Sequence, residues 1–284
     1  MRIVSFFADG RESYGAVIDD GIIDAGQRLG ARFASFAAVL EAEAFGEFKR
    51  EVSGKPADCA LEDVTLVPPV RGRNPVFCVG RNYAEVNEQA GYPEAAYPSI
   101  FQRRHAAQVG HGQPMIKPKV SDMFDTEVEL ALIIGKRGRH ISEGEAIYHV
   151  AGYTILCESS VVDWMNHTSR NVTPGKNFDA SGAMGPWMVT ADEVADPTRL
   201  SIIQRINDET VQEGSTSAMI YSIPRLIAYL SSFTELIPGD VISTGTPGGI
   251  HARRKQGLFL QAGDAVEAEI SGIGVLQNEV VAEA

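Results

Sequence analysis

Glu127 and Glu129 lie two positions apart in an otherwise apolar run that continues to Ile134 and stops at Gly135. Such a run predicts a strand buried on both faces, and because side chains alternate along a strand, both carboxylates should point to the same face. Two neighbouring carboxylates repel each other and are costly to bury, and a divalent cation would offset both costs. The alternative is a half-exposed strand with two solvated glutamates, as the cleaner alternation of residues 266–270 indicates for that stretch.

A third carboxylate, Glu158, ends a second apolar run that begins at Val150. Three carboxylates offer only oxygen ligands, which suit magnesium, manganese or calcium. Zinc more often recruits His or Cys, and neither lies here at ligand spacing. We therefore expect Glu127, Glu129 and Glu158 to hold Mg²⁺ or Mn²⁺, with Ca²⁺ as a substitute in a crystal.

The elements that must position these groups divide the chain into two parts. Short apolar runs separated by Asp-Gly predict a β-meander over residues 1–25, and helical composition follows over residues 35–52. The prolines at 68–69 follow a strand and indicate a linker. We therefore expect a small N-terminal α/β domain over residues 1–68 and a larger catalytic domain over residues 69–284.

Two helices are predicted in the larger part. Ser142 and Glu145 form a capping-box pattern, which predicts a short helix that ends near Tyr148. Ser222 precedes an amphipathic segment that reaches Phe233, and it is a favourable N-cap residue. Short strands make up most of the remaining sequence, so the fold class that we expect is mostly β, of the α+β type.

Composition limits the partners of the chain. With 37 acidic and 25 basic residues among 284, the net charge is −12, which argues against nucleic acid or an anionic membrane as a partner. No apolar run approaches the roughly 20 residues that cross a bilayer, and the N-terminus lacks the apolar core of a signal peptide. Three widely spaced cysteines indicate reduced thiols. These features predict a cytoplasmic protein that acts on a small molecule.

Six short segments resemble, in this order, the fumarylacetoacetate hydrolase family in its bacterial form with a small N-terminal domain. They lie at residues 79–83, 127–131, 151–154, 175–179, 185–187 and 239–249. The resemblance implies a catalytic domain folded as a mixed β-sandwich roll, also called a β-clip, and a homodimer. It also implies that the pair Glu127 and Glu129 binds magnesium or manganese, with Glu158 as the third ligand.

The resemblance assigns roles to further residues. Lys176 matches the active-site lysine of the family, and Thr246 matches the threonine whose turn faces a substrate carboxylate. The other substrate contacts that the resemblance implies are Arg81, Tyr83, Gly245 and Arg103, which stands where a lysine is common.

Four polar positions of the family pocket hold different residues in this chain. The His-x-x-Glu pair of the hydrolases falls on Val86 and Gln89, and neither can act as a general base for water. A pocket arginine and a pocket glutamine fall on Val162 and Met165. We therefore expect a largely apolar substrate face that binds acidic substrates poorly. The groups that could replace the base from another direction are Glu88, His105, His111 and His167.

Three functions follow from the resemblance. Family members act on compounds with a 1,3-dicarbonyl or 2-oxo acid core, and the metal stabilises an enolate as a Lewis acid. The first hypothesis is a hydrolase that cleaves a C–C bond in a 1,3-diketone or oxo-enol acid, as in the catabolism of aromatic compounds. The second is a decarboxylase or a tautomerase, similar to 2-hydroxyhepta-2,4-diene-1,7-dioate isomerase, because these reactions need no attacking water. The third is a catalytically silent relative that binds a metal and a small ligand.

Overall fold

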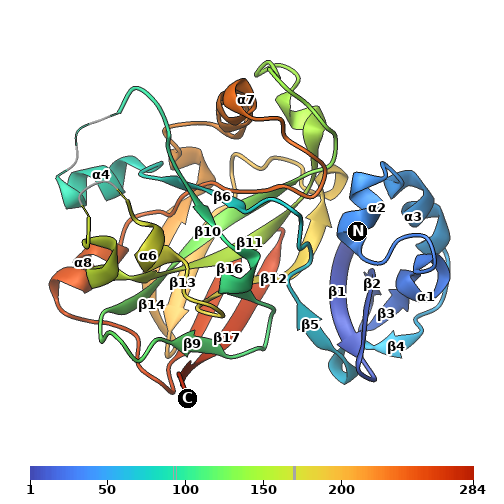
Figure 1. Cartoon of the computed structure of the whole chain (residues 1–284), viewed down its shortest axis with the longest axis horizontal. Helices are drawn as coiled ribbons and strands as arrows, with labels where there is room; N and C mark the ends of the chain where they lie inside the picture. Colours follow the sequence, from blue (N-terminus) through green and yellow to red (C-terminus); the bar gives the residue numbers. More distant parts are fainter. Residues whose placement is uncertain (92, 94, 169–170) are drawn as a thin grey trace.

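Two β-sheets form the framework of the protein (Figure 1). The structure, a computed structural model, describes residues 1–91, 93, 95–168 and 171–284. In this part of the chain, the first sheet has twelve strands and runs in the order β4 (Cys59–Ala60), β3 (Gly21–Asp24), β2 (Arg11–Ile18), β1 (Arg2–Ala8), β12 (Gly182–Thr190), β11 (Val150–Val161), β10 (Phe124–Ile134), β15 (Val241–Ser243), β6 (Val76–Gly80) and β7 (Ser99–Arg103), with β5 (Thr65–Val67) beside β1 and β8 (Gln108–Val109) beside β12. The second sheet runs in the order β14 (Glu209–Ser215), β13 (Ser201–Ile206), β16 (Ala265–Ile270), β17 (Gly274–Ala282) and β9 (Met115–Lys117).

Short helices surround these sheets. They are α1 (Ala25–Leu29), α2 (Phe36–Glu41), α3 (Phe45–Val52), α4 (Ala84–Ala90), α5 (Val162–Met165), α6 (Thr173–Lys176), α7 (Ile223–Phe233) and α8 (Ile250–Lys255). None of the described helices combines the length and the apolar character needed to cross a membrane. The protein is thus mostly β with added helices, which confirms the predicted fold class.

Strand β10 is buried along its whole length because both of its faces are covered. Val128 and Leu130 face a core that they share with Ile202 of the second sheet. Ala131, on the other face, belongs to a core that it shares with Phe36 of helix α2. From Leu130 onward the two parities of the strand therefore meet two different cores, which explains why both parities are apolar there.

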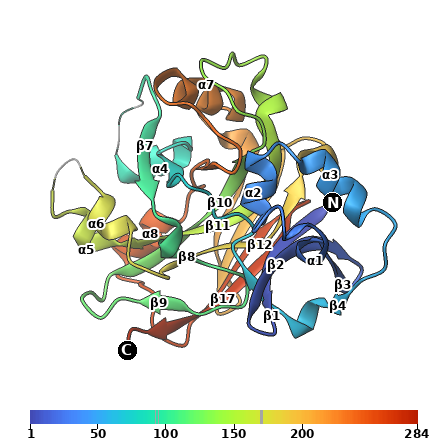
Figure 2. The ribbon, with the colours of Figure 1, turned by 45° about the vertical axis from the view of Figure 1, so that its right-hand side comes forward.

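The N-terminal strands continue the first sheet. Arg2 and Ile3 of β1 pair with Val189 and Met188 of β12 in antiparallel register. The N-terminal strands and helices, drawn in blue, lie to one side of the larger body in both views (Figures 1 and 2). The domain boundary after residue 68 stays a prediction, but a shared sheet and a shared core argue against independent folding of the two parts.

The observed helices differ from the sequence-based predictions in two places. Ser222 caps α7 as predicted, because its hydroxyl accepts a hydrogen bond from a backbone N–H of the first turn. The cap predicted at Ser142 is wrong, since Ala146–His149 forms only a 3₁₀ turn without a side-chain cap. The helical stretch 35–52 is divided into α2 and α3, with Glu43 at a positive φ between them.

Replacing Phe36 would test whether the N-terminal part and the larger part of the chain share one core. Its side chain is fully buried, and its ring packs against the rings of Tyr14 and Phe48. We expect Phe36→Ala to lower the free energy of unfolding by about 3–5 kcal/mol and to shift a single transition of the whole chain in scanning calorimetry. Phe7 is 38% exposed, so Phe7→Ala should lower the free energy of unfolding much less. Two resolved transitions, of which Phe36→Ala moves only one, would show that the N-terminal part unfolds independently.

Candidate active site

Three glutamates come together where β10 pairs with β11. In the antiparallel register Glu127 lies opposite Glu158, and Glu129 follows two positions along β10 on the same face. Ligand oxygens of the three side chains all lie within 4.8 Å of one another. The structure thus assembles the three carboxylates that the sequence suggested as a metal site.

Three cationic side chains contact Glu127 and Glu158. Lys176 Nζ lies 3.2 Å from Glu127 Oε1 and 2.6 Å from Glu158 Oε2. Arg254 Nη2 lies 2.9 Å from Glu127 Oε1, and Arg103 Nη1 lies 3.3 Å from Glu158 Oε1. Burial opposes ionisation of Glu127, but Lys176 and Arg254 outweigh it and lower its pKa to about 2. Glu127 is therefore a carboxylate at neutral pH.

Glu129 has a different environment. The Ser243 hydroxyl and the Gly245 N–H both donate to its Oε2, and Gly245 has a φ of +94°, which favours glycine. No cation of the described residues forms an ion pair with it. Burial, followed by the charges of Glu158 and Glu127, raises the pKa of Glu129 to about 8. A divalent cation would compensate this carboxylate, so the oxygen-only donor set fits Mg²⁺ or Mn²⁺.

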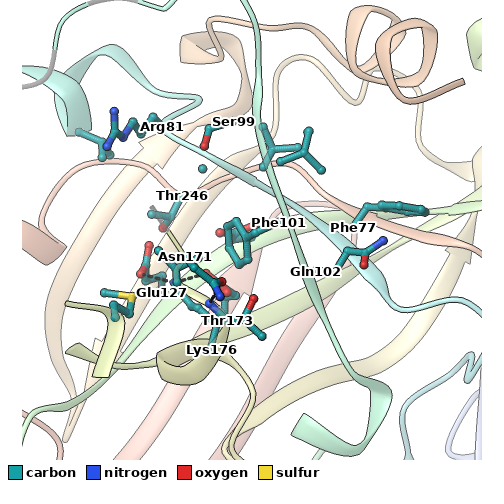
Figure 3. Close-up of a pocket in the computed structure, with 18 of the residues that line it drawn as sticks. Phe77, Arg81, Ser99, Phe101, Gln102, Glu127, Asn171, Thr173, Lys176 and Thr246 are labelled. Carbon is teal, nitrogen blue, oxygen red and sulfur yellow. Dashed lines mark hydrogen bonds and ion pairs between the residues drawn. The ribbon is translucent and has the colours of Figure 1, made fainter. Parts of the chain in front are cut away.

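The glutamates form part of the wall of a cavity of about 810 Å³ (Figure 3). The other predicted site residues that line it are Arg81, Val86, Met165, Lys176 and Thr246. These residues come from the start of α4, from α5 and α6, and from the turn after β15. Segments far apart in the sequence therefore meet around the carboxylates.

Five predicted substrate contacts are not part of the cavity lining. They are Tyr83, Gln89, Arg103, Val162 and Gly245. Arg103 is fully buried and donates to Glu158 and to the Ser159 hydroxyl, so it supports a carboxylate instead of contacting a substrate. Tyr83 is also buried, and its hydroxyl has no hydrogen-bond partner among the described residues.

The expected apolar substrate face is only partly present. Gln89 is exposed, and its side-chain carbonyl accepts a hydrogen bond from the backbone N–H of Gly249, which ties α4 to the start of α8. Val162 begins α5 without lining the cavity. Of the four substituted positions, Val86 and Met165 reach the cavity.

Helix α8 contributes cavity residues that the sequence analysis missed. His251 and Arg254 line the cavity. Arg253 and Arg254 both form ion pairs with Asp125, at 2.9 and 3.0 Å, which holds α8 against β10. Burial, and then the charge of Arg254, lowers the pKa of His251, so its ring is neutral at neutral pH. The available signal was a basic run at residues 251–255, which closely follows the family-like segment 239–249.

The four groups suggested as replacement bases do not line the cavity. Glu88 is exposed on α4. His105 Nε2 lies 2.9 Å from a backbone carbonyl oxygen, and His111 lines a second cavity. His167 is exposed and packs against Trp164 with ring centroids 4.7 Å apart. None of the four therefore faces the described cavity, and His251 is the histidine that its lining contains.

Comparisons with known proteins find relatives both in sequence and in structure. Residues 75–281 match the family described as fumarylacetoacetate (FAA) hydrolase, C-terminal. The human oxaloacetate tautomerase FAHD2A, mitochondrial, is 42% identical over 220 residues, which are 77% of this chain and 70% of the relative. The solved structure of fumarylacetoacetate hydrolase from psychrophilic Exiguobacterium antarcticum has a TM-score of 0.84 at 30% identity, with 100% of both chains covered. Maleylpyruvate hydrolase from Sphingobium sp. SYK-6, solved with manganese(II) ion and pyruvate, has a TM-score of 0.81 at 27% identity over 100% of both chains.

Replacing Glu129 would test the metal site. Mn²⁺ should raise the melting temperature of the natural protein and EDTA should remove the gain, because a ligand bound only by the folded state stabilises it. Glu129→Gln resembles the protonated side chain and should fold normally, but it removes a ligand charge, so the gain with Mn²⁺ should disappear. Glu88→Gln, at an exposed position, should keep the full gain. An unchanged gain in Glu129→Gln would place the ion elsewhere.

Metal affinity should depend on pH through Glu129. With a pKa of about 8 in the metal-free protein, Glu129 holds a proton below that pH, and cation binding must release it. The apparent Kd for Mn²⁺ should therefore fall by up to about tenfold per pH unit as pH rises toward about 8, and change little above it. Titration calorimetry in buffers of different ionisation enthalpy measures the released proton. A pH-independent Kd without proton release would contradict the assignment.

Proposed function

The chain belongs to the fumarylacetoacetate hydrolase family, and from this premise we propose that it is a metal-dependent tautomerase of oxaloacetate or a closely similar 2-oxo acid. The observation that carries the proposal is a complete carboxylate cluster beside an apolar Val86 and a Gln89 that lies outside the cavity lining. Enol–keto conversion needs a stabilised enolate and a proton carrier, but no activated water. The name of the human relative, an oxaloacetate tautomerase, supports this choice.

The reaction moves a proton between C3 of the substrate and the oxygen on C2. A divalent cation held by the three glutamates would supply Lewis-acid stabilisation of the enolate charge. Lys176 contacts both Glu127 and Glu158, and its ammonium group favours further negative charge in the cavity. Ser243 and Gly245 fix the orientation of Glu129. These contacts prepare the site before a substrate enters.

The charge of the cavity lining suits a dicarboxylate. Among the described lining residues, the cations Arg81, Lys176 and Arg254 equal the three glutamates in number, so the side chains are neutral overall once cation binding has released the proton of Glu129. With a divalent cation the lining would carry two positive charges, and oxaloacetate is a dianion at neutral pH. The expectation that acidic substrates bind poorly, drawn from the four substituted positions, is therefore revised, because Arg254 also lines the cavity.

Hydrolysis of a C–C bond is the second candidate. The similarity to maleylpyruvate hydrolase supports it. Hydrolysis, however, depends on a base positioned for water, which is worth about 10²–10⁴ in rate. Val86 offers only carbon atoms at the position of the family histidine, so hydrolysis would have to recruit His251, which lines the cavity from α8. Decarboxylation also passes through an enolate, so carbon dioxide release should be measured beside tautomerisation.

The enol form of oxaloacetate should disappear faster when the protein and Mn²⁺ are both present. Loss of enol absorbance gives the rate, and NMR identifies the keto product. The double variant Glu127→Gln with Glu129→Gln should be slower by at least about 10²-fold, whereas Glu88→Gln should keep the natural rate.

Acetylpyruvate and fumarylpyruvate are the substrates that test the hydrolase alternative. Both should be cleaved much more slowly than oxaloacetate is tautomerised. Faster cleavage of either compound would favour the hydrolase, and the absence of every reaction would favour the silent relative.

A further inference from the structure

The proposed reaction needs a proton carrier, and the cavity lining restricts which side chain can serve. Among the described lining residues, the ionisable groups besides the three glutamates are Arg81, Lys176, His251 and Arg254. Arginine stays protonated in proteins, and the glutamates are assigned to the cation. Lys176 and His251 remain as candidates.

Lys176 is committed to an electrostatic role. Its ammonium group is buried and contacts a carboxylate on each of two strands, Glu127 at 3.2 Å and Glu158 at 2.6 Å. Loss of its proton would leave both carboxylates without this cation, so the two contacts retain the proton. An ammonium group of this kind stabilises charge but does not accept a proton.

We propose that His251 is the catalytic residue that carries the proton between the C2 oxygen and C3 of oxaloacetate, an assignment that rests on the proposed tautomerase function. His251 lies in the first turn of α8 and lines the same cavity as Glu127 and Arg254. A neutral imidazole accepts a proton at one ring nitrogen and carries a proton at the other. The ring therefore has the required chemistry inside the cavity that holds the carboxylate cluster.

Helix α8 is held against α4 at both of its ends. Gly249 N–H donates to Gln89 Oε1 at 3.2 Å, and Lys255 Nζ donates to the backbone carbonyl of Gln89 at 2.8 Å. A Cβ atom added to Gly248 would lie 3.0 Å from Gln89 Nε2, so the two elements approach closely. Helix α4 presents no base to the cavity, and α8, bound to it through Gln89, presents His251.

The proton transfer balances within the substrate and one side chain. From enol to keto, His251 takes the proton of the C2 hydroxyl, and the electron pair of that O–H bond stays on the oxygen of the enolate. The oxygen pair then forms the C2=O double bond while the electron pair of the C2=C3 bond takes the proton back from the imidazolium at C3. The histidine returns to its neutral form, and no further reactant is consumed.

His251→Ala in the full chain with Mn²⁺ would test the assignment. The rate of enol loss should fall by about 10²-fold or more, and added imidazole should restore part of it in a concentration-dependent way, because a free base can enter the space left. The rise in melting temperature with Mn²⁺ should remain, which would show that the carboxylate cluster is intact. His167→Ala, at an exposed histidine outside the lining, should keep the natural rate.

The outcomes separate the two proposals. A natural protein that does not accelerate enol loss refutes the tautomerase function. An active natural protein with a fully active His251→Ala variant refutes only the role of His251. If Mn²⁺ no longer raises the melting temperature of His251→Ala, the test is repeated with His251→Asn. The asparagine side chain is polar but cannot carry the proton. Full activity of His251→Asn, or loss of activity without imidazole rescue in a variant that still binds Mn²⁺, overturns the assignment.

Discussion

Glu127 and Glu158 face each other across neighbouring strands, and two like charges in that position destabilise a sheet unless positive charge lies beside them. Lys176 supplies that charge to both, while Arg254 and Arg103 each reinforce one of them. The segments that carry these cations must therefore pack against the sheet. Because α6 and α8 also form cavity walls, charge balance and cavity shape have the same physical cause.

The carboxylate cluster could be predicted because it depends on local rules. Glu127 and Glu129 are polar exceptions in an apolar run, and alternation along a strand places them on one face whatever the rest of the chain does. The partnership with Glu158 depends on strand register, which the sequence does not display. Glu158 was grouped with them because it ends a second apolar run, and the resemblance of several short segments to one family supported that grouping.

The cavity lining was harder to predict because it depends on tertiary packing. Arg254 and His251 belong to a basic run that on its own indicates a solvated helix, but contacts with Asp125, Glu127 and Gln89 hold that helix at the site. Arg103 is the opposite case. The resemblance implied that it contacts a substrate, but it is fully buried and donates a hydrogen bond to Glu158. Sequence identifies the kind of side chain, whereas packing decides whether it faces a substrate or a carboxylate.

All eleven residues of β10 are buried; its apolar side chains lie in two cores, and its three acidic side chains face cations, hydroxyls or the cavity. Such a strand offers no position at which a bulky or polar replacement would be harmless, so it would tolerate little sequence drift even without any catalysis. Invariance along β10 among related proteins would therefore say little about function. Glu127 and Glu129 would be informative for another reason, because packing alone favours apolar residues there and some further constraint must keep them acidic.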